Sequence, residues 1–164
     1  MEADILEELY REHYSAAMLY CLALCGDEQL AQDLTADAFV KAYLSLPDRI
    51  PSFRWWLLAV CRNLWMDYLR KNKRLVGSDS LEHLSSTQTH EKEYLTKERS
   101  QALWRAVQSL EGVDRELVTA FYFSGVPLYQ LAQLMGISYS AARQRLVRLR
   151  RKLKQKMEEL GYGI

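Results

Sequence analysis

The chain has 164 residues and a formal net charge of +1, and 49% of its residues are hydrophobic, 26% charged and 11% aromatic. No apolar run approaches the ~20 residues that a membrane-spanning helix needs, so we expect no such helix. The first residues, Met1-Glu2-Ala3-Asp4, are acidic where a secretory leader would be basic, and we therefore expect a cytoplasmic protein.

Helical periodicity predicts two helices in the first part of the chain. The first extends from Ile5 to about Cys25, because Gly26 can end it in a left-handed conformation. Asp27 can cap the second helix, which extends to about Leu46. Residues 1–48 contain ten acidic and two basic residues, so this part carries an acidic surface. Four residues at helical spacing predict the inward side of the second helix: Leu30, Leu34, Ala38 and Tyr43.

A third helix is predicted after a loop that contains two prolines. It begins near Ser52 and continues into the basic cluster of residues 70–74. Residues 49–74 contain seven basic residues and one acid, and aromatic residues lie among the cations. This combination is typical of surfaces that bind unpaired DNA bases. The four-residue spacing of Trp56, Val60 and Leu64 predicts that they face the core, whereas Trp55 and Arg62 are expected to be exposed.

The middle of the chain predicts a boundary between two domains. From residue 75 to residue 93 the helical period fades into a stretch rich in Ser and Thr, which is typical of a flexible linker. Periodicity returns at Tyr94, and breaks near Gly112, Gly125 and Gly136 divide the rest into further helices. The predicted fold is all-α, with two small helical domains, residues 1–74 and 94–164, joined by a linker over residues 75–93.

Residues 127–138 have the pattern of a helix-turn-helix. Small Ala132 suits a close helix crossing, Gly136 suits a turn with positive φ, and Ser138 can cap the next helix. Residues 135–157 contain eight cations and no acid, which indicates a polyanionic partner such as DNA. A stripe at helical spacing is expected to pack inward: Ala142, Leu146, Leu149, Leu153 and Met157.

The three cysteines and three histidines show no catalytic or metal-ligand spacing. We therefore expect no enzyme activity and no cofactor. Cys21, Cys25 and Cys61 are interpreted as reduced core thiols. The alternative is a redox or metal sensor that joins Cys21 and Cys25 to His13 or Cys61.

Taken in order, the motifs resemble those of a bacterial extracytoplasmic-function (ECF) sigma factor that has only sigma regions 2 and 4. Residues 33–43 are similar to region 2.2, residues 53–70 to regions 2.3 and 2.4, and residues 110–153 to region 4. The sequence departs from the family pattern at two positions. Ala36 stands where the family often has glutamine, and Pro127 stands where a capping serine or threonine is common. Residues 139–141 also differ from the usual run before the cations of the recognition helix.

The resemblance implies three sets of contact residues. Core RNA polymerase, through the clamp coiled coil of its largest subunit, would contact Asp33, Leu34, Asp37, Phe39 and Tyr43. The melted −10 element would contact Arg49, Arg54, Trp55, Arg62, Asn63, Asp67, Arg70 and Lys71. The −35 duplex would contact Ser138, Tyr139, Ser140, Arg143, Gln144, Arg145, Arg148 and Arg151.

The same resemblance implies further partners. The polymerase flap is expected as a second docking point, and a membrane-linked anti-sigma factor as a regulator. Polymerase would perform the chemistry, and no small-molecule substrate is expected.

Two other functions compete with this one. A two-domain repressor or activator would bind duplex DNA without polymerase. This function does not explain the cationic and aromatic residues of the third helix. A helical adaptor would use the basic C-terminal helix only as a solvated surface. A salt-dependent mobility shift with promoter DNA would count against the adaptor, and capture of core polymerase would count against the repressor.

Overall fold

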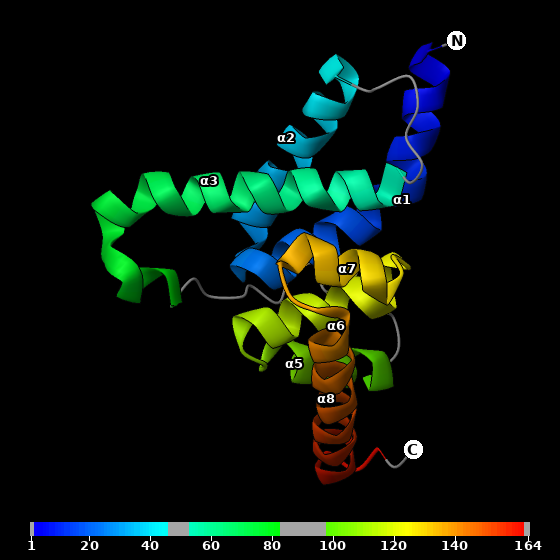
Figure 1. The fold of residues 1–164 in the computed structure, drawn as a ribbon, viewed down its shortest axis with the longest axis vertical. Coiled ribbons are helices and arrows are strands. Elements are labelled where there is room, and N and C mark those ends of the chain that lie inside the picture. Colours follow the sequence, from blue (N-terminus) through cyan, green and yellow to red (C-terminus); the bar gives the residue numbers. More distant parts are fainter. Residues whose placement is uncertain (1, 46–52, 83–97, 163–164) are drawn as a thin grey trace. The chain divides into compact units, whose positions relative to one another are not determined.

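The structure is a computed structural model that describes residues 2–45, 53–82 and 98–162, and these residues form seven helices and no strand (Figure 1). The chain divides into two units, Met1–Ser86 and Thr87–Ile164. This arrangement confirms the all-α prediction. None of the described helices is long and apolar enough to cross a membrane. The helices are α1 Glu2–Cys25, α2 Glu28–Ser45, α3 Phe53–Glu82, α5 Glu98–Gln108, α6 Gly112–Ser124, α7 Leu128–Met135 and α8 Tyr139–Glu159.

In the first unit, α1, α2 and α3 contact one another in pairs. Gly26 has φ of 74° and separates α1 from α2, as predicted, because a left-handed residue ends a helix at little cost when it has no Cβ. The inward side of α2 differs from the prediction at two residues: Tyr43 is exposed, and Leu30 is only half-buried. The buried side of α2 consists of Glu28, Ala31, Leu34, Thr35, Ala38, Phe39 and Ala42.

The inward face of α3 is displaced by one residue from the predicted one. Leu57, Cys61 and Trp65 are buried together with Leu58. The predicted stripe of Trp56, Val60 and Leu64 is only half-buried. Both stripes are apolar and have the same four-residue spacing, so the spacing establishes the helical period, whereas contact with α1 and α2 decides which side turns inward.

Helix α3 is longer than expected, since it ends at Glu82 and therefore includes part of the predicted linker. Gly77 is the only residue in this extension that strongly disfavours a helix, and a single glycine costs only about 1 kcal/mol relative to alanine. Residues 83–93 of the predicted linker lie outside the described residues.

The second unit is built around α8, which contacts α5, α6 and α7. All five residues of its predicted inward stripe are buried, which confirms that prediction. Gly125 ends α6 in a left-handed conformation, whereas Gly112 begins α6 rather than ending α5. The core joins α5 and α6 to α8 through Ala106, Val107, Leu110, Leu117, Val118, Leu146, Leu149 and Leu153.

Candidate nucleic-acid interface

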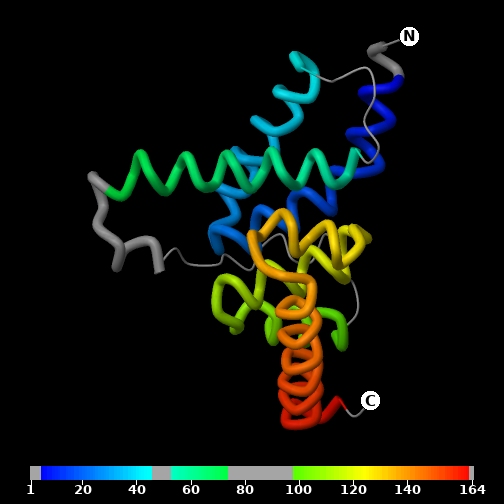
Figure 2. The backbone as a smooth tube through the Cα atoms, viewed as in Figure 1, coloured from blue at the N-terminus to red at the C-terminus, as the bar shows by residue number. Residues whose placement is uncertain are grey.

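Helices α7 and α8 form a helix-turn-helix whose turn has the predicted features (Figure 2). Gly136 has φ of 70°, and the amide of Ile137 donates to the carbonyl of Ala132 across 3.0 Å. The side chain of Ser138 accepts from the amide of Ala141 at 3.0 Å and thereby caps α8. Ala132 is buried between the helices of this unit. The short-range signals of the sequence therefore predicted this motif correctly.

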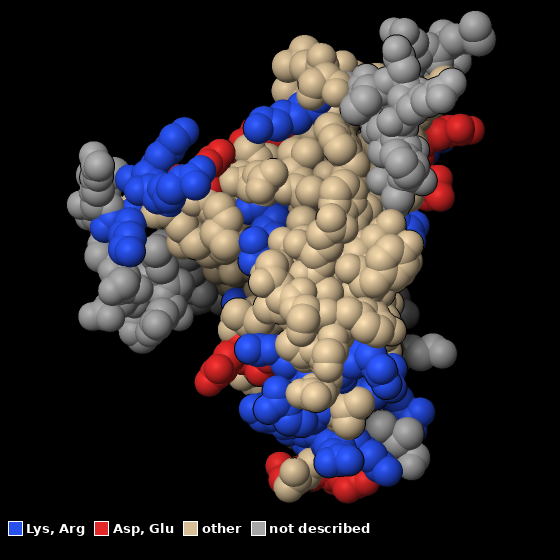
Figure 3. Space-filling model, viewed as in Figure 1, with Lys and Arg blue, Asp and Glu red and all other residues tan. Residues whose placement is uncertain are grey.

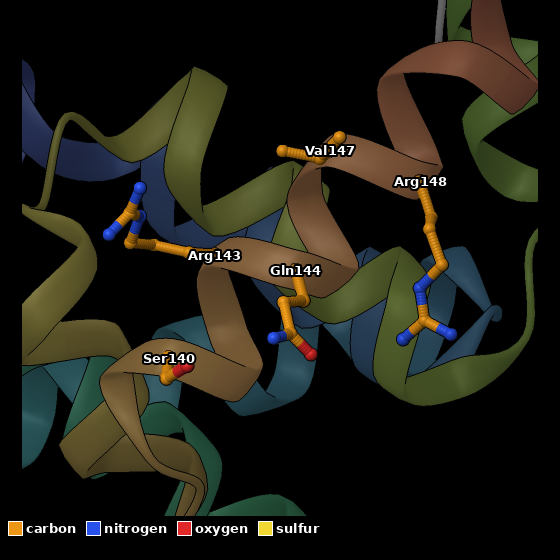
Figure 4. Close-up of a pocket in the computed structure, with 5 residues that line it drawn as sticks. All are labelled: Ser140, Arg143, Gln144, Val147 and Arg148. Atoms are coloured by element: carbon orange, nitrogen blue, oxygen red, sulfur yellow. The ribbon is translucent and has the colours of Figure 1, made fainter.

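The outward face of α8 holds a shallow hollow of about 500 Å³ opposite the buried stripe. Figure 4 shows that all of its lining side chains come from the first half of α8: Ser140, Arg143, Gln144, Val147 and Arg148. The Arg143 guanidinium lies over the ring of Tyr139, with 5.8 Å between its central carbon and the ring centroid. Sequence reasoning missed Val147, although its helical position opposite the stripe was a usable signal. An exposed valine in this place can contact a thymine methyl group.

The flanks of α8 carry further cations, and lysine and arginine side chains gather over this helix (Figure 3). Arg151 is exposed near the outward face. Arg145 turns toward α6 instead, where its Nη1 lies 3.1 Å from a carboxylate oxygen of Asp114. The ion pair places Arg145 on the side of the helix, and not among the side chains that can reach base edges.

The opposite flank of α8 borders an apolar groove of about 410 Å³. It lies against α5 and α6 of the same unit, and Leu153 and Met157 contribute from α8. Two cations of α8, Arg150 and Lys154, also line it, and the guanidinium of Arg150 lies over the ring of Tyr122. The groove can accept an apolar helix face with acidic residues at its edge.

The exposed side of α3 presents polar residues at helical spacing. Asn63 is exposed, and Asp67 and Arg70 follow it at intervals of four and three residues. Asp67 and Arg70 form an ion pair with each other. Lys71 is exposed, and Figure 3 shows cations gathered at this end of α3. Trp55 and Arg62, expected to be exposed, are half-buried. Arg49 lies outside the described residues.

Arg54 turns inward at the start of α3, contrary to the expectation that it faces DNA. Its Nε donates to Nδ1 of His13 in α1 across 3.2 Å, and the ring of Phe53 lies 5.1 Å from the imidazole. His13 is buried. Burial and the neighbouring Arg54 cation lower the pKa of His13, while Glu12 opposes them. The imidazole is therefore neutral at pH 7 and accepts through Nδ1.

A second surface lies between α1 and α2, where a groove of about 580 Å³ is formed. Asp33 and Tyr43 line it, as do Tyr10 and Tyr14 of α1. Phe39 is buried and packs against both tyrosines, with ring centroids 4.8 and 6.4 Å away.

Only some of the residues predicted to contact polymerase are accessible in the first unit. Asp33, Asp37 and Tyr43 are exposed, whereas Leu34 and Phe39 are buried. The buried pair therefore supports this surface from within, and the exposed residues are those that can contact a partner.

The three thiols are buried and unpaired, as interpreted from the sequence. Burial raises the pKa of Cys25 to about 12. A hydrogen bond with Cys21 and burial raise the pKa of Cys61 well above its ordinary value. Within the described ranges no three His, Cys, Asp or Glu side chains could hold a metal ion.

Fold and surfaces together define the class: a two-unit helical protein with a basic helix-turn-helix in its C-terminal unit and a second, cationic helix surface in its N-terminal unit. Residues 9–75 match the Sigma-70 region 2 family, and residues 100–153 match the Sigma-70 region 4 family. The chain belongs to the sigma-70 family and is an ECF-type alternative sigma factor, which directs RNA polymerase to promoters.

Known relatives agree with this assignment over nearly the whole chain. RNA polymerase sigma factor SigZ of Bacillus subtilis is 28% identical over 155 residues, which cover 93% of this chain and 87% of SigZ. ECF RNA polymerase sigma factor SigM of the same organism is 28% identical, with coverage of 91% and 93%. The fold is similar to that of the sigma factor RpoE from Bartonella quintana, solved with the anti-sigma factor NepR, at a TM-score of 0.73, 22% identity and coverage of 93% and 98%.

Proposed function

We propose that this sigma factor docks on core polymerase through two separate surfaces and reads a promoter through two others. The observation that carries the proposal is the presence of regions 2 and 4, in this order, in one chain with a basic recognition helix. A sigma factor contributes recognition, and polymerase supplies the catalysis. We therefore assign this chain the role of binding polymerase and promoter DNA, and we place it in the cytoplasm.

The groove between α1 and α2 is the proposed site for the clamp coiled coil of the largest polymerase subunit. Exposed Tyr10 and Tyr43 offer large apolar areas, and Asp33 and Asp37 offer negative charge beside them. Tyrosines surrounded by charged residues are typical of protein–protein interfaces. A partner helix with apolar and basic residues would be complementary to this groove.

The apolar groove beside α8 is the proposed docking site for the polymerase flap. Its floor is formed by core residues such as Val107, Val118 and Leu153, and its cationic lining favours an apolar helix with acidic flanks. The outward face of α8 is on another side of the helix, so flap docking and DNA reading can occur together.

Strand opening at the −10 element is assigned to α3. Asn63 and Arg70 on its exposed side are the proposed polar readers, with Lys71 on the phosphate backbone. Half-buried Trp55 and Arg62 would need only a small rearrangement to meet an unpaired base, and base–aromatic stacking contributes roughly 1–3 kcal/mol per base. Arg54 is assigned to holding the start of α3 on α1.

The −35 duplex is assigned to α8. Side chains in its first turns, including Ser140, Arg143 and Gln144, are placed to meet base edges when the helix enters the major groove. Arg148 and Arg151 are placed farther along for phosphates.

An anti-sigma factor is proposed as regulator, because the structurally similar RpoE of Bartonella quintana was solved with the anti-sigma factor NepR. A link of that partner to the membrane remains part of the proposal. Copurification of the tagged chain from its own cells, followed by identification of bound proteins, would reveal the partner.

The deciding experiment is run-off transcription with purified core polymerase and a pool of promoters. We expect transcripts from a small subset of promoters only when the chain is added. The repressor function would instead yield DNA binding without capture of core polymerase, and the adaptor function would yield neither transcripts nor salt-dependent DNA binding.

A further inference from the structure

The side chain of His13 holds the first turn of α3 on α1. Its Nδ1 accepts from Nε of Arg54 at 3.2 Å, and the imidazole lies 5.1 Å from the ring of Phe53, measured between centroids. Phe53 in turn contacts Trp56, with 5.8 Å between the ring centroids. One residue of α1 therefore contacts both residues that begin α3, and a further ring contact extends from them to Trp56.

The first turn of α3 depends on this support because its own sequence stabilises it poorly. The first N–H groups of a helix have no partner within the helix, and they carry the positive end of its dipole. The first turn of α3 contains no acidic residue and includes the Arg54 cation, which is unfavourable at this end. The hydrogen bond to His13 therefore fixes Arg54 in a place that the helix alone does not favour.

His13 can hold Arg54 only while its imidazole is neutral. A neutral imidazole has one accepting nitrogen, whereas a protonated one can only donate. His13 is 7% exposed, so little water is available to solvate a second cation beside Arg54. Protonation would therefore break the hydrogen bond and release the first turn of α3.

Two charged groups act on the imidazole of His13. Arg54 of α3 disfavours a proton, and Glu12 of α1 favours one. The carboxylate of Glu12 lies 3.9 Å from Nε2 and is mostly exposed to water, so it compensates a buried proton only weakly. No charged group in the described part of α2 is among the groups that shift this pKa.

We propose that His13 is a positioning residue for strand opening at the −10 element, because its neutral imidazole, through Arg54 and Phe53, fixes the first turn of α3 and the aromatic side chains that follow. The inference rests on the proposed function, in which α3 opens the −10 element. It extends that function to α1, since His13 lies outside the motifs from which contact residues were predicted.

The test measures promoter opening by the complex of this chain with core polymerase, followed by permanganate reactivity over time. His13→Ala removes the acceptor and should slow opening by about two- to tenfold, the effect expected for one hydrogen bond. His13→Asn keeps an acceptor near the Nδ1 position and should restore most of the rate. Thr35→Ala is the matched control, because it removes a buried hydrogen bond to the carbonyl of Ala31 and changes neither His13 nor α3.

A pH profile gives a readout that a merely structural role would not change. Because pH also affects polymerase, the measured quantity is the opening rate of His13→Asn divided by that of the wild type at each pH. Burial and Arg54 lower the pKa of His13 from 6.5, so the imidazole takes up a proton only below that pH. The ratio should be constant between about pH 8 and about pH 7, and it should rise below pH 6.5, because only the wild type titrates.

A promoter with a mismatched, already unpaired −10 element isolates the opening step. On this template His13→Ala should show no defect, because the strands are separated before the chain binds. The pH ratio requires only His13→Asn, so it tests the inference even if His13→Ala does not fold.

The outcomes separate this inference from the proposed function. If the wild-type complex opens no promoter, the proposed function fails and the inference fails with it. If the wild type opens promoters, three results would each refute the inference alone. These are an opening rate of His13→Ala equal to that of the wild type or of Thr35→Ala, a ratio that does not change with pH, and a defect of the same size on the mismatched template.

Discussion

Among individual residues, His13 connects the stability of the first unit to pH. Its neutral imidazole accepts from Arg54, and a protonated ring would lose this bond and place two cations 3.2 Å apart. Burial is the larger cause of its lowered pKa, and the Arg54 cation is the second. The folded chain therefore disfavours a proton that the unfolded chain accepts.

The free energy of unfolding should fall as pH drops below the ordinary histidine pKa of 6.5 and continue to fall until the lowered pKa of folded His13 is passed. Above pH 6.5 this contribution is fully present. His13→Asn keeps an acceptor near the Nδ1 position and cannot titrate. Urea unfolding of both proteins at about pH 8 and about pH 5.5 should show the larger loss in the wild type. An equal loss in both would mean that other groups cause the acid sensitivity.

Arg143 and Arg151 should have different roles on the same helix. Arg143→Ala should change the preference among −35 sequences, because a lost arginine–guanine pair costs about 1–3 kcal/mol at one base. Arg151→Ala should weaken all sequences alike and make the salt slope shallower by about one. Binding of both variants, in complex with core polymerase, to a randomised −35 library at several salt concentrations distinguishes them. The reverse pattern would show that α8 is oriented differently in the groove.

At the level of elements, the start of α8 depends on its cap. Ser138→Ala removes the acceptor for the Ala141 amide and should lower the free energy of unfolding by about 1 kcal/mol. Ser138→Asn retains a capping oxygen and serves as the control. Urea denaturation measures both. A loss of −35 binding by Ser138→Ala at unchanged stability would assign Ser138 to DNA contact instead.

Helix α3 should act on melted DNA more than on duplex DNA. Asn63→Ala should impair strand opening and leave closed-complex formation nearly unchanged, at a cost of about 0.5–1.5 kcal/mol for a lost hydrogen bond. Asn72→Ala on the same helix is the control, since Asn72 is half-buried and its side chain donates to the carbonyl of Tyr68. Permanganate footprints of the open bubble report the difference. Identical footprints in the wild type and Asn63→Ala would remove Asn63 from the −10 site.

For the whole molecule, polymerase docking and promoter reading should be separable. Asp37→Lys and Tyr43→Ala should each weaken binding to core polymerase, and loss of a central interface tyrosine costs about 2 kcal/mol. Glu8→Lys makes a comparable charge reversal on α1 at an exposed residue that does not line the groove. Titration of labelled chain with core polymerase measures the affinities. Unchanged affinity in folded Asp37→Lys and Tyr43→Ala would move the docking site elsewhere.

The features that the sequence alone determined are local ones. Gly136, Ser138 and the buried stripe of α8 were predicted correctly, because turn geometry, capping and helical period depend on residues within a few positions of one another. The order of region 2 and region 4 motifs was also visible without coordinates, and it carried the family assignment.

Contacts between distant residues were decided only by the tertiary structure. The spacing of Trp56, Val60 and Leu64 could not reveal that α3 turns its neighbouring stripe inward, because two apolar stripes had the same period. Arg54 and His13 lie 41 residues apart, and Arg145 and Asp114 lie 31 residues apart. Such pairs leave no periodic signal, because packing between helices brings them together and thereby decides which cations remain for DNA.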